Sequence, residues 1–246
     1  MTNTLPSIEL HNPNNYKICK RIFSKYNYIN FIDLETTGFD ENKDHIIEIG
    51  ILKINMQTFQ AHSSFHTKVF IPDNIRINKE IVELTGITED QLKDAPKLQD
   101  LLDGILVFLG EGEPVIAHNS QFDMRFLNKA FSLKYEDFDI YEKYEIFDTL
   151  SISRNYYDKN SLDYLASIFL IKKDDHHGAL KDCYKLWHVL IMLNNVEKAV
   201  NNIFFSQRCP ECGGFLVERT NRWDKTTFLG CNNYPSCTYP RKNKGK

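Results

Sequence analysis

Apolar positions divide the chain into short segments that follow either a strand or a helix pattern. Several segments are rich in Ile, Val, Phe and Tyr and are bounded by polar turn residues, which is typical of strands. The predicted strands are Tyr28–Leu34, Ile46–Ile54, Ser64–Ile71, Pro114–Ala117 and Glu145–Asp148. The connections between the first three are short enough for an antiparallel meander.

Other segments repeat their apolar residues every three or four positions, as one face of a helix does. The predicted helices are Tyr16–Lys25, Leu98–Leu109, Ser120–Phe131, Ser161–Phe169 and Ala179–Leu193. Ser120 is a candidate N-cap, and the last helix is strongly apolar on one side. Leu84–Asp90 is predicted as a turn, with Thr88 as a candidate N-cap.

This order of elements predicts an α/β fold. Strands come first and then alternate with helices, which favours a mixed sheet with helices packed against it. Polar, Asn-rich residues 1–27 are interpreted as an extension that packs on this domain, which spans 28–195. A polar linker is expected over 196–204. A small domain is expected over 205–246, where Cys, Gly, Pro and basic residues are frequent.

Length and composition fit one sizeable core plus a small module. The chain has 246 residues, of which 42% are hydrophobic and 26% charged. No segment has the pattern of a membrane span or of a signal peptide, so a cytoplasmic protein without a membrane partner is expected.

The net charge of −3 is unevenly distributed along the chain. Residues 205–246 contain eight Lys or Arg and three Asp or Glu, a net of +5, so the remainder carries −8. An acidic body with a basic tail fits a metal-dependent catalytic domain joined to a nucleic-acid-binding module. A basic tail that is only solvated would give the same balance.

Four acidic residues in separate segments are the candidate catalytic groups. Asp33 and Glu35 end the first predicted strand on the same face, because strand side chains alternate. Adjacent carboxylates repel each other unless a cation lies between them, and carboxylate oxygens suit Mg²⁺ or Mn²⁺. Asp123 and Asp182 lie early in two predicted helices, within the segments HNSQFD and HGALKD. Acids on a helix surface are the alternative, and Asp123 would also stabilise a helix N-terminus.

These segments, in this order, resemble the DEDDh family of 3′–5′ exonucleases, which includes the proofreading epsilon subunit of bacterial DNA polymerase III. The resemblance rests on FIDLETTG, HNSQFD and HGALKD, with LTGIT and FDTL as further family-like segments, and covers roughly residues 28–193. It implies a ribonuclease H-like fold with a mixed five-stranded sheet flanked by helices. It also implies that Asp33, Glu35, Asp123 and Asp182 hold two Mg²⁺ or Mn²⁺ ions for phosphodiester hydrolysis.

A histidine close to the last acid is the candidate general base. The family spacing places it five residues before the final aspartate, which selects His177 over its neighbour His176. A polar loop residue is the alternative for either histidine. Asp148 and His118 are interpreted as structural.

The resemblance also implies contacts to the substrate. Leu34 and Thr36 are expected to face the terminal nucleotide, Asn119 to make a polar contact, and Phe122 to stack on a base or wedge beside it. Turn capping for Thr36 and Asn119, and core packing for Phe122, are equally open.

Four of the six cysteines, Cys209, Cys212, Cys231 and Cys237, lie in the last 40 residues. Their clustering predicts one structural Zn²⁺ rather than disulfides in a reducing compartment. The five residues between the second pair depart from the two that are usual in zinc ribbons. CPECGG and FLGCNNYPSC instead resemble the C-terminal zinc fingers of type IA DNA topoisomerases, which implies a zinc-ribbon-like module that binds single-stranded DNA.

Aromatic and basic residues alternate within this module, whose predicted strands are Phe215–Arg219 and Thr227–Leu229. Aromatic rings can stack on bases and cations can attract phosphates, although some of these rings are expected to fill the small core. The residues concerned are Trp223, Phe228, Tyr234 and Tyr239, with Arg219, Arg222, Lys225, Arg241 and Lys242.

Together these patterns predict a metal-dependent exonuclease that releases nucleoside monophosphates from the 3′ end of DNA, preferably single-stranded. A DNA polymerase or a repair complex is a candidate partner. Two alternatives stay open: an exoribonuclease that trims RNA 3′ ends, and a catalytically silent adaptor that binds nucleic acid.

Overall fold

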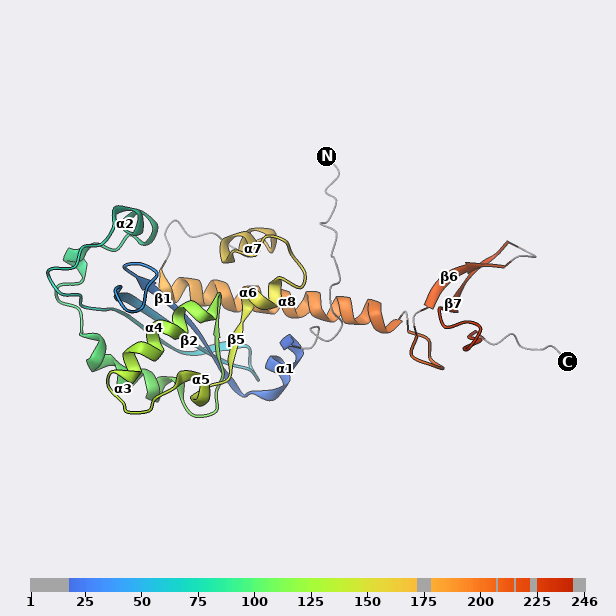
Figure 1. Ribbon diagram of the computed structural model, residues 1–246, viewed down its shortest axis with the longest axis horizontal. Helices are drawn as coiled ribbons and strands as arrows, with labels where there is room; N and C mark the ends of the chain where they lie inside the picture. Colours follow the sequence, from blue (N-terminus) through green and yellow to red (C-terminus); the bar gives the residue numbers. More distant parts are fainter. Residues whose placement is uncertain (1–17, 172–177, 207, 215, 222–224, 241–246) are drawn as a thin grey trace. The chain divides into compact units, whose positions relative to one another are not determined.

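The computed structural model describes residues 18–171, 178–206, 208–214, 216–221 and 225–240 (Figure 1). The chain divides into two compact units, residues 1–194 and 195–246, and the division falls within helix α8 (Ala179–Ser206). Across the described ranges, no helix combines the length and the apolar composition that crossing a membrane requires.

The first unit contains a mixed five-stranded sheet in the order β3–β2–β1–β4–β5. The strands are β1 (Tyr28–Thr36), β2 (Ile46–Asn55), β3 (Gln60–Lys68), β4 (Val115–Ala117) and β5 (Ile146–Asp148). The first three form an antiparallel meander, β4 is parallel to β1, and β5 is parallel to β4. The predicted mixed sheet and its meander are confirmed.

The third strand begins earlier than its apolar pattern predicts. The Asn55 side chain accepts hydrogen bonds from the main-chain N–H groups of Gln57 and Thr58, which forms a tight turn. Pairing with β2 therefore starts at Gln60 rather than Ser64. The first three residues of β3 are exposed on this edge of the sheet, and Gln60 and His62 among them are polar, so hydrophobicity alone could not reveal them.

Eight helices are found within the described ranges of the chain. They are α1 (Ile18–Lys25), α2 (Lys79–Thr85), α3 (Leu98–Leu109), α4 (Ser120–Ser132), α5 (Ile140–Lys143), α6 (Thr149–Ser153), α7 (Leu162–Ile168) and α8 (Ala179–Ser206). The sequence analysis missed α2, α5 and α6, which are short and begin at polar caps. Their caps are Asn78, Asp139 and Asp148, and each side chain accepts a main-chain N–H.

Two predicted caps have different outcomes. Thr88 is the N-cap of a 3₁₀ turn, Glu89–Gln91. Ser120 is not a cap, because the N-cap of α4 is Asn119, which has a left-handed backbone with φ of 68°.

Helices cover both faces of the sheet (Figure 1). Ile32 and Leu34 of β1 pack in one apolar cluster with residues of α3 and α4. On the opposite face, the Trp187 ring of α8 lies 5.5 Å from Phe31 and 6.1 Å from Phe23 of α1. Because strand residues alternate, Asp33 and Glu35 share the α8 face with Phe31.

The described part of the N-terminal extension packs on the rest of the first unit. Cys19 and Ile22 of α1 are fully buried. Three side chains from this segment, Arg21, Lys25 and Tyr26, bind the Glu145 carboxylate just before β5.

The segment 196–204, expected as a linker, is helical, because α8 continues through it to Ser206. Polar composition suggested a break, but Asn194, Glu197 and Val200 recur at helical spacing and are buried. The second unit then contains an antiparallel hairpin of β6 (Leu216–Thr220) and β7 (Thr227–Cys231), close to the predicted strands.

Candidate active site

Three of the predicted acids come together where β1 meets the start of α8. One carboxylate oxygen from each of Asp33, Glu35 and Asp182 lies within 4.8 Å of the others. Asp33 and Glu35 point from the same face of β1, and Asp182 comes from the first turn of α8. Residues that are almost 150 positions apart therefore form one acidic cluster.

The close approach of α8 to the sheet depends on β2. Gly50 pairs with Asp33, and a Cβ atom there would lie 2.3 Å from the main-chain nitrogen of Leu180. The buried Glu48 accepts a 2.8 Å hydrogen bond from the Ala179 N–H, which anchors the first turn of the helix. Together they bring Asp182 against β1.

Asp123 approaches from the other layer of the fold. It lies in the first turn of α4, is 3% exposed, and accepts a 3.1 Å hydrogen bond from the Leu34 N–H. It lies outside the 4.8 Å group, but its charge is one of those that raise the pKa of Asp33. The structure thus gathers all four predicted acids at the end of β1.

The electrostatics of this cluster fit a divalent cation. Burial, followed by the charges of Asp123, Glu35 and Asp182, holds the pKa of Asp33 well above its ordinary value. Burial likewise raises the pKa of Asp123. Ionising several neighbouring carboxylates is unfavourable on its own, but it becomes favourable once a cation neutralises their charge. The residues present therefore suit Mg²⁺ or Mn²⁺.

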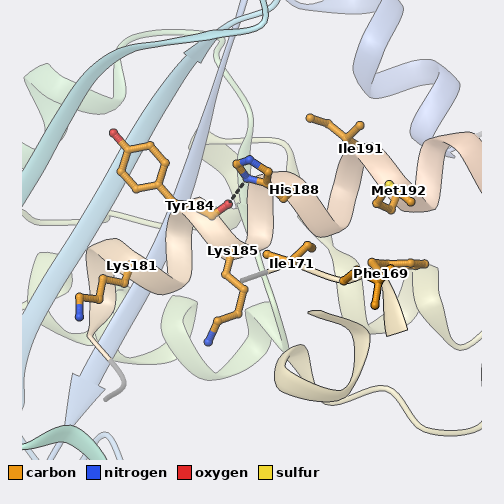
Figure 2. Close-up of a pocket in the computed structure, with 9 residues that line it drawn as sticks. Phe169, Ile171, Lys181, Tyr184, Lys185, His188, Ile191 and Met192 are labelled. Atoms are coloured by element: carbon orange, nitrogen blue, oxygen red, sulfur yellow. Dashed lines mark hydrogen bonds between the residues drawn. The ribbon is translucent and has the colours of Figure 1, made fainter. Parts of the chain in front are cut away.

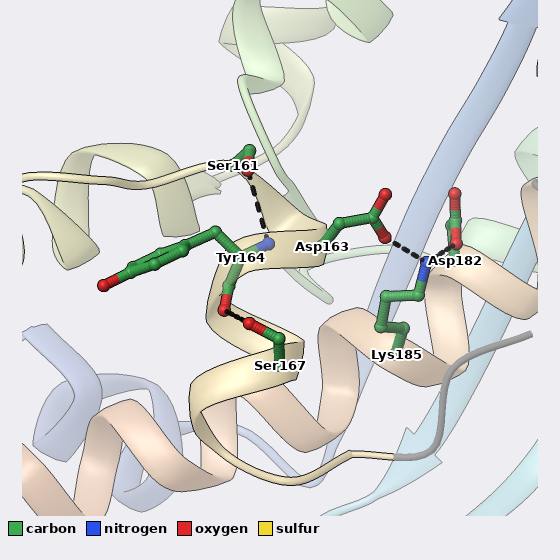
Figure 3. A network of polar contacts seen from close by, with 6 residues as sticks. All are labelled: Ser161, Asp163, Tyr164, Ser167, Asp182 and Lys185. Atoms are coloured by element: carbon green, nitrogen blue, oxygen red, sulfur yellow. Dashed lines mark hydrogen bonds and ion pairs between the residues drawn. The ribbon is translucent and has the colours of Figure 1, made fainter. Parts of the chain in front are cut away.

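A buried ammonium group also contacts the cluster (Figure 3). The Nζ atom of Lys185 lies 2.6 Å from Oδ1 of Asp182 and 2.9 Å from Oδ1 of Asp163, which comes from α7. Burial lowers the Lys185 pKa, but the hydrogen bonds to both carboxylates outweigh it and raise that pKa. The sequence analysis did not identify this pair.

Of the three histidines considered in the sequence analysis, only His118 lies within the described residues. His177 and His176 lie outside the described residues. The Nδ1 atom of His118 is 2.9 Å from the Thr149 hydroxyl, and burial lowers the His118 pKa, so this neutral ring supports the end of β4.

Asp148 is structural, as predicted. One of its oxygens caps α6 through the Leu150 N–H and also accepts the Asn119 N–H over 2.8 Å. Asp148 therefore holds Asn119 at the start of α4.

The residues predicted to contact the substrate differ in how much of their side chains is available to bind it. The Thr36 hydroxyl donates to the Gly38 carbonyl over 2.6 Å, so it is used in the turn after β1. The Leu34 side chain is 5% exposed and packs in the core, which leaves little of it for a nucleotide. Phe122 is partly buried at the core edge, with its ring 5.1 Å from that of Phe126.

The sequence analysis missed one exposed aromatic residue in the turn that follows β1. Phe39 lies four residues after Glu35 and is 83% exposed. Its ring packs edge to face against Phe122 at 6.2 Å. A large apolar residue in the turn directly after an acidic motif was the signal available in the sequence.

A cavity of about 480 Å³ is lined by α8 and by the segment that follows α7 (Figure 2). Its lining is largely apolar and includes Phe169 and Ile171, which follow α7. Lys185 and His188 from α8 add polar atoms. Lys185 therefore borders this cavity and also contacts Asp182.

In the second unit, the sulfur atoms of Cys209, Cys212, Cys231 and Cys237 lie within 4.8 Å of one another. The Cys209–Cys237 and Cys212–Cys231 sulfur distances are 3.6 and 3.4 Å. A tetrahedral Zn²⁺ site needs about 3.8 Å between sulfurs. A main-chain hydrogen bond from Gly214 lowers the pKa of Cys212 to about 7, which favours the thiolate, so the quartet fits zinc.

Part of the predicted aromatic and basic surface is described. The Arg219 guanidinium lies 5.5 Å from the centre of the exposed Tyr234 ring, and Phe228 is also exposed. Tyr239 instead packs against the cysteines, as expected for a ring that fills the small core. Some of the predicted residues lie outside the described part of the chain, namely Arg222, Trp223, Arg241 and Lys242.

Comparison with known proteins identifies matches to both units. Residues 31–190 match the family model described as Exonuclease, and residues 206–246 match the Topoisomerase DNA binding C4 zinc finger. The PolC-type DNA polymerase III of Caldanaerobacter subterraneus is 36% identical over 68% of this chain, which spans 12% of that protein. The DNA polymerase III epsilon subunit of Buchnera aphidicola is 31% identical over 69% of this chain and 75% of its own length.

Solved structures share the fold at lower identity. The nuclease domain of 3′hExo, a DEDDh family member, has a TM-score of 0.59 and 20% identity over 70% of this chain and 94% of its own. Exonuclease I of E. coli, bound to an oligonucleotide, has a TM-score of 0.63 and 15% identity over 75% of this chain and 44% of its own. With the family model covering residues 31–190, the chain belongs to the exonuclease family.

Proposed function

We propose that this protein is a metal-dependent 3′–5′ exonuclease that removes nucleoside monophosphates from the 3′ end of single-stranded DNA. The observation that carries the proposal is the gathering of four acids at the end of β1, with burial and mutual repulsion raising the pKa of Asp33. Two Mg²⁺ or Mn²⁺ ions held by these acids would supply an activated water and stabilise the leaving oxygen.

The chain's own residues supply positioning and proton transfer. His177, selected by its spacing from Asp182, accepts the proton of the attacking water. Phe39 and Phe122 offer an aromatic pair for the terminal base, and Asn119 offers a polar contact. Leu34 and Thr36 contribute through the main chain at the strand end, because their side chains are largely buried.

In this proposal, residues 28–195 carry out catalysis, residues 205–246 bind the nucleic-acid strand, and residues 1–27 form an extension. Zinc held by the four cysteines would stabilise the second module, whose exposed Tyr234 and Phe228 suit base stacking. Reduced thiolates fit a cytoplasmic location. The names of the polymerase relatives support DNA as the substrate and a polymerase or repair complex as the partner.

The test is a time course with DNA and RNA strands that are labelled and blocked at either end. The proposal predicts that a free 3′ end is required, that mononucleotides are released, and that DNA is preferred. Faster loss of RNA would indicate an exoribonuclease. Tight binding without nucleotide release, with Mn²⁺ present, would indicate an adaptor.

A further inference from the structure

Lys185 is a buried charge that the proposed reaction does not use. Its side chain is 9% exposed, as is that of Asp182, while Asp163 is 44% exposed. Lysine has a long flexible side chain that normally reaches water. Burying its ammonium group is unfavourable unless fixed partners compensate for the lost hydration.

The two carboxylates hold this ammonium from two helices. Asp163 lies in the first turn of α7, and Asp182 lies three residues before Lys185 on α8. A surface pair at this spacing contributes little to stability. Here both members of the Lys185–Asp182 pair are buried, so solvent and salt screen their interaction much less.

A simple clamp between helices does not need this arrangement. The Lys185–Asp163 pair alone would join α7 to α8, yet the shorter bond, at 2.6 Å, goes to the acid of the cluster. Lys185 therefore acts on the acidic cluster through its contact with Asp182.

We propose that Lys185, held in place by Asp163, is a fixed counter-charge that engages one oxygen of Asp182 and sets the divalent-metal affinity of the acidic cluster. A fixed positive charge beside the cluster weakens binding of a second cation, and Asp163 offsets part of that charge. Lys185 is a positioning residue, because it acts through Asp182. The inference rests on the proposed function only in treating the cluster as a cation site.

The test is a Mn²⁺ titration of the full chain, loaded with zinc and free of nucleic acid, followed by calorimetry or by the signal of free Mn²⁺. Lys185→Met should bind Mn²⁺ about tenfold more tightly and Asp163→Asn about threefold more weakly, because the two changes alter the local charge in opposite directions. Lys185→Arg should stay within about twofold of the wild type. Lys129→Met, which removes an exposed lysine of α4, is the matched control and should have no effect.

Tighter Mn²⁺ binding by Lys185→Met together with weaker Mn²⁺ binding by Asp163→Asn would support the counter-charge. The reverse pair of changes, a change in the same direction in both variants, or no change in either, would overturn it. Asp163 is half-exposed, so its variant tests the sign even if Lys185→Met unfolds. If Asp33→Asn still binds Mn²⁺ as the wild type does, the cluster is not the cation site and the proposed function fails as well. Loss of Mn²⁺ by that variant, with Lys185→Met unchanged, refutes the counter-charge alone.

Discussion

The Leu34 main-chain N–H donates a 3.1 Å hydrogen bond to the Asp123 carboxylate, which joins the strand that carries Asp33 and Glu35 to the helix on the opposite face of the sheet. This bond fixes the fourth acid at the end of β1, although it comes from a different layer than Asp182. The cluster is therefore assembled by main-chain geometry as well as by side chains.

Gly50→Ala should separate α8 from the sheet. The added Cβ would lie 2.3 Å from main-chain atoms of Ala179 and Leu180, which cannot move as a flexible side chain can. We expect a loss of about 3 kcal/mol in unfolding free energy, measured by chemical denaturation, together with loss of nuclease activity.

Gly104→Ala is the matched control. Gly104 lies within α3, and a Cβ there meets nothing within 4 Å. Alanine should stabilise this helix by about 1 kcal/mol. Equal stability of the two variants would show that Gly50 does not limit the approach of α8.

Glu48→Ala should disturb the start of α8 without touching the acidic cluster directly. It removes the acceptor of the buried Ala179 N–H, and an unsatisfied buried donor costs about 1–3 kcal/mol. Misplacing Asp182 should lower kcat by between about tenfold and a hundredfold, with a smaller effect on KM. Glu48→Gln retains an oxygen acceptor and should keep most of the activity, so equal losses in both variants would contradict this role.

Without added Mg²⁺ or Mn²⁺, the protein should lose stability as pH rises. The pKa of Asp33 is higher in the folded chain than in the unfolded chain. Its contribution to stability is therefore full below the unfolded value, near 3.9, and is lost as pH rises through the folded value. Tm measured by calorimetry should fall as pH rises above about 5, where ordinary carboxylates are already ionised, and Mn²⁺ should reverse this fall.

Asp33→Asn isolates that effect, because it removes the buried negative charge. In the absence of Mn²⁺, its Tm should fall less than that of the wild type as pH rises above about 5. A lower Tm for the variant would show that the carboxylate is not under electrostatic strain.

Phe39→Ala should weaken substrate binding while leaving the fold intact. The ring is 83% exposed and contacts Phe122, so its removal should not change Tm. Loss of one stacking partner should raise the Kd for a single strand about tenfold, measured by fluorescence anisotropy. Leu133→Ala removes another exposed apolar residue and should leave the Kd unchanged. If both variants bind the single strand with equal affinity, Phe39 is not part of the substrate-binding site.

Cys231→Ser should abolish zinc binding, because the quartet supplies four sulfur ligands. Metal analysis should find one zinc per wild-type chain and none in the variant. Release of nucleotides from long single strands should slow, while hydrolysis of very short strands continues. Unchanged rates on long strands would show that this module does not take part in substrate binding.

The sequence predicted the meander, the mixed sheet and the approach of four acids, because each depends on local pattern or on motif order. It could not predict Gly50 or Glu48 as the contacts that seat α8, since these are tertiary contacts between distant segments. The Asp163–Lys185–Asp182 network was missed for the same reason. The polar composition of 196–204 predicts a linker, whereas Asn194, Glu197 and Val200 follow a helical spacing and α8 continues through the segment.

Nucleotide release from a 5′-labelled single strand in Mn²⁺ tests the acidic cluster most directly. The wild type should produce progressively shorter labelled fragments, and Asp33→Asn should be at least about a hundredfold slower while keeping its fold. Asp100→Asn, an exposed acid of α3, should match the wild type. Full activity of Asp33→Asn, or release of the 5′ label as the first product, would contradict a 3′–5′ exonuclease built on these carboxylates.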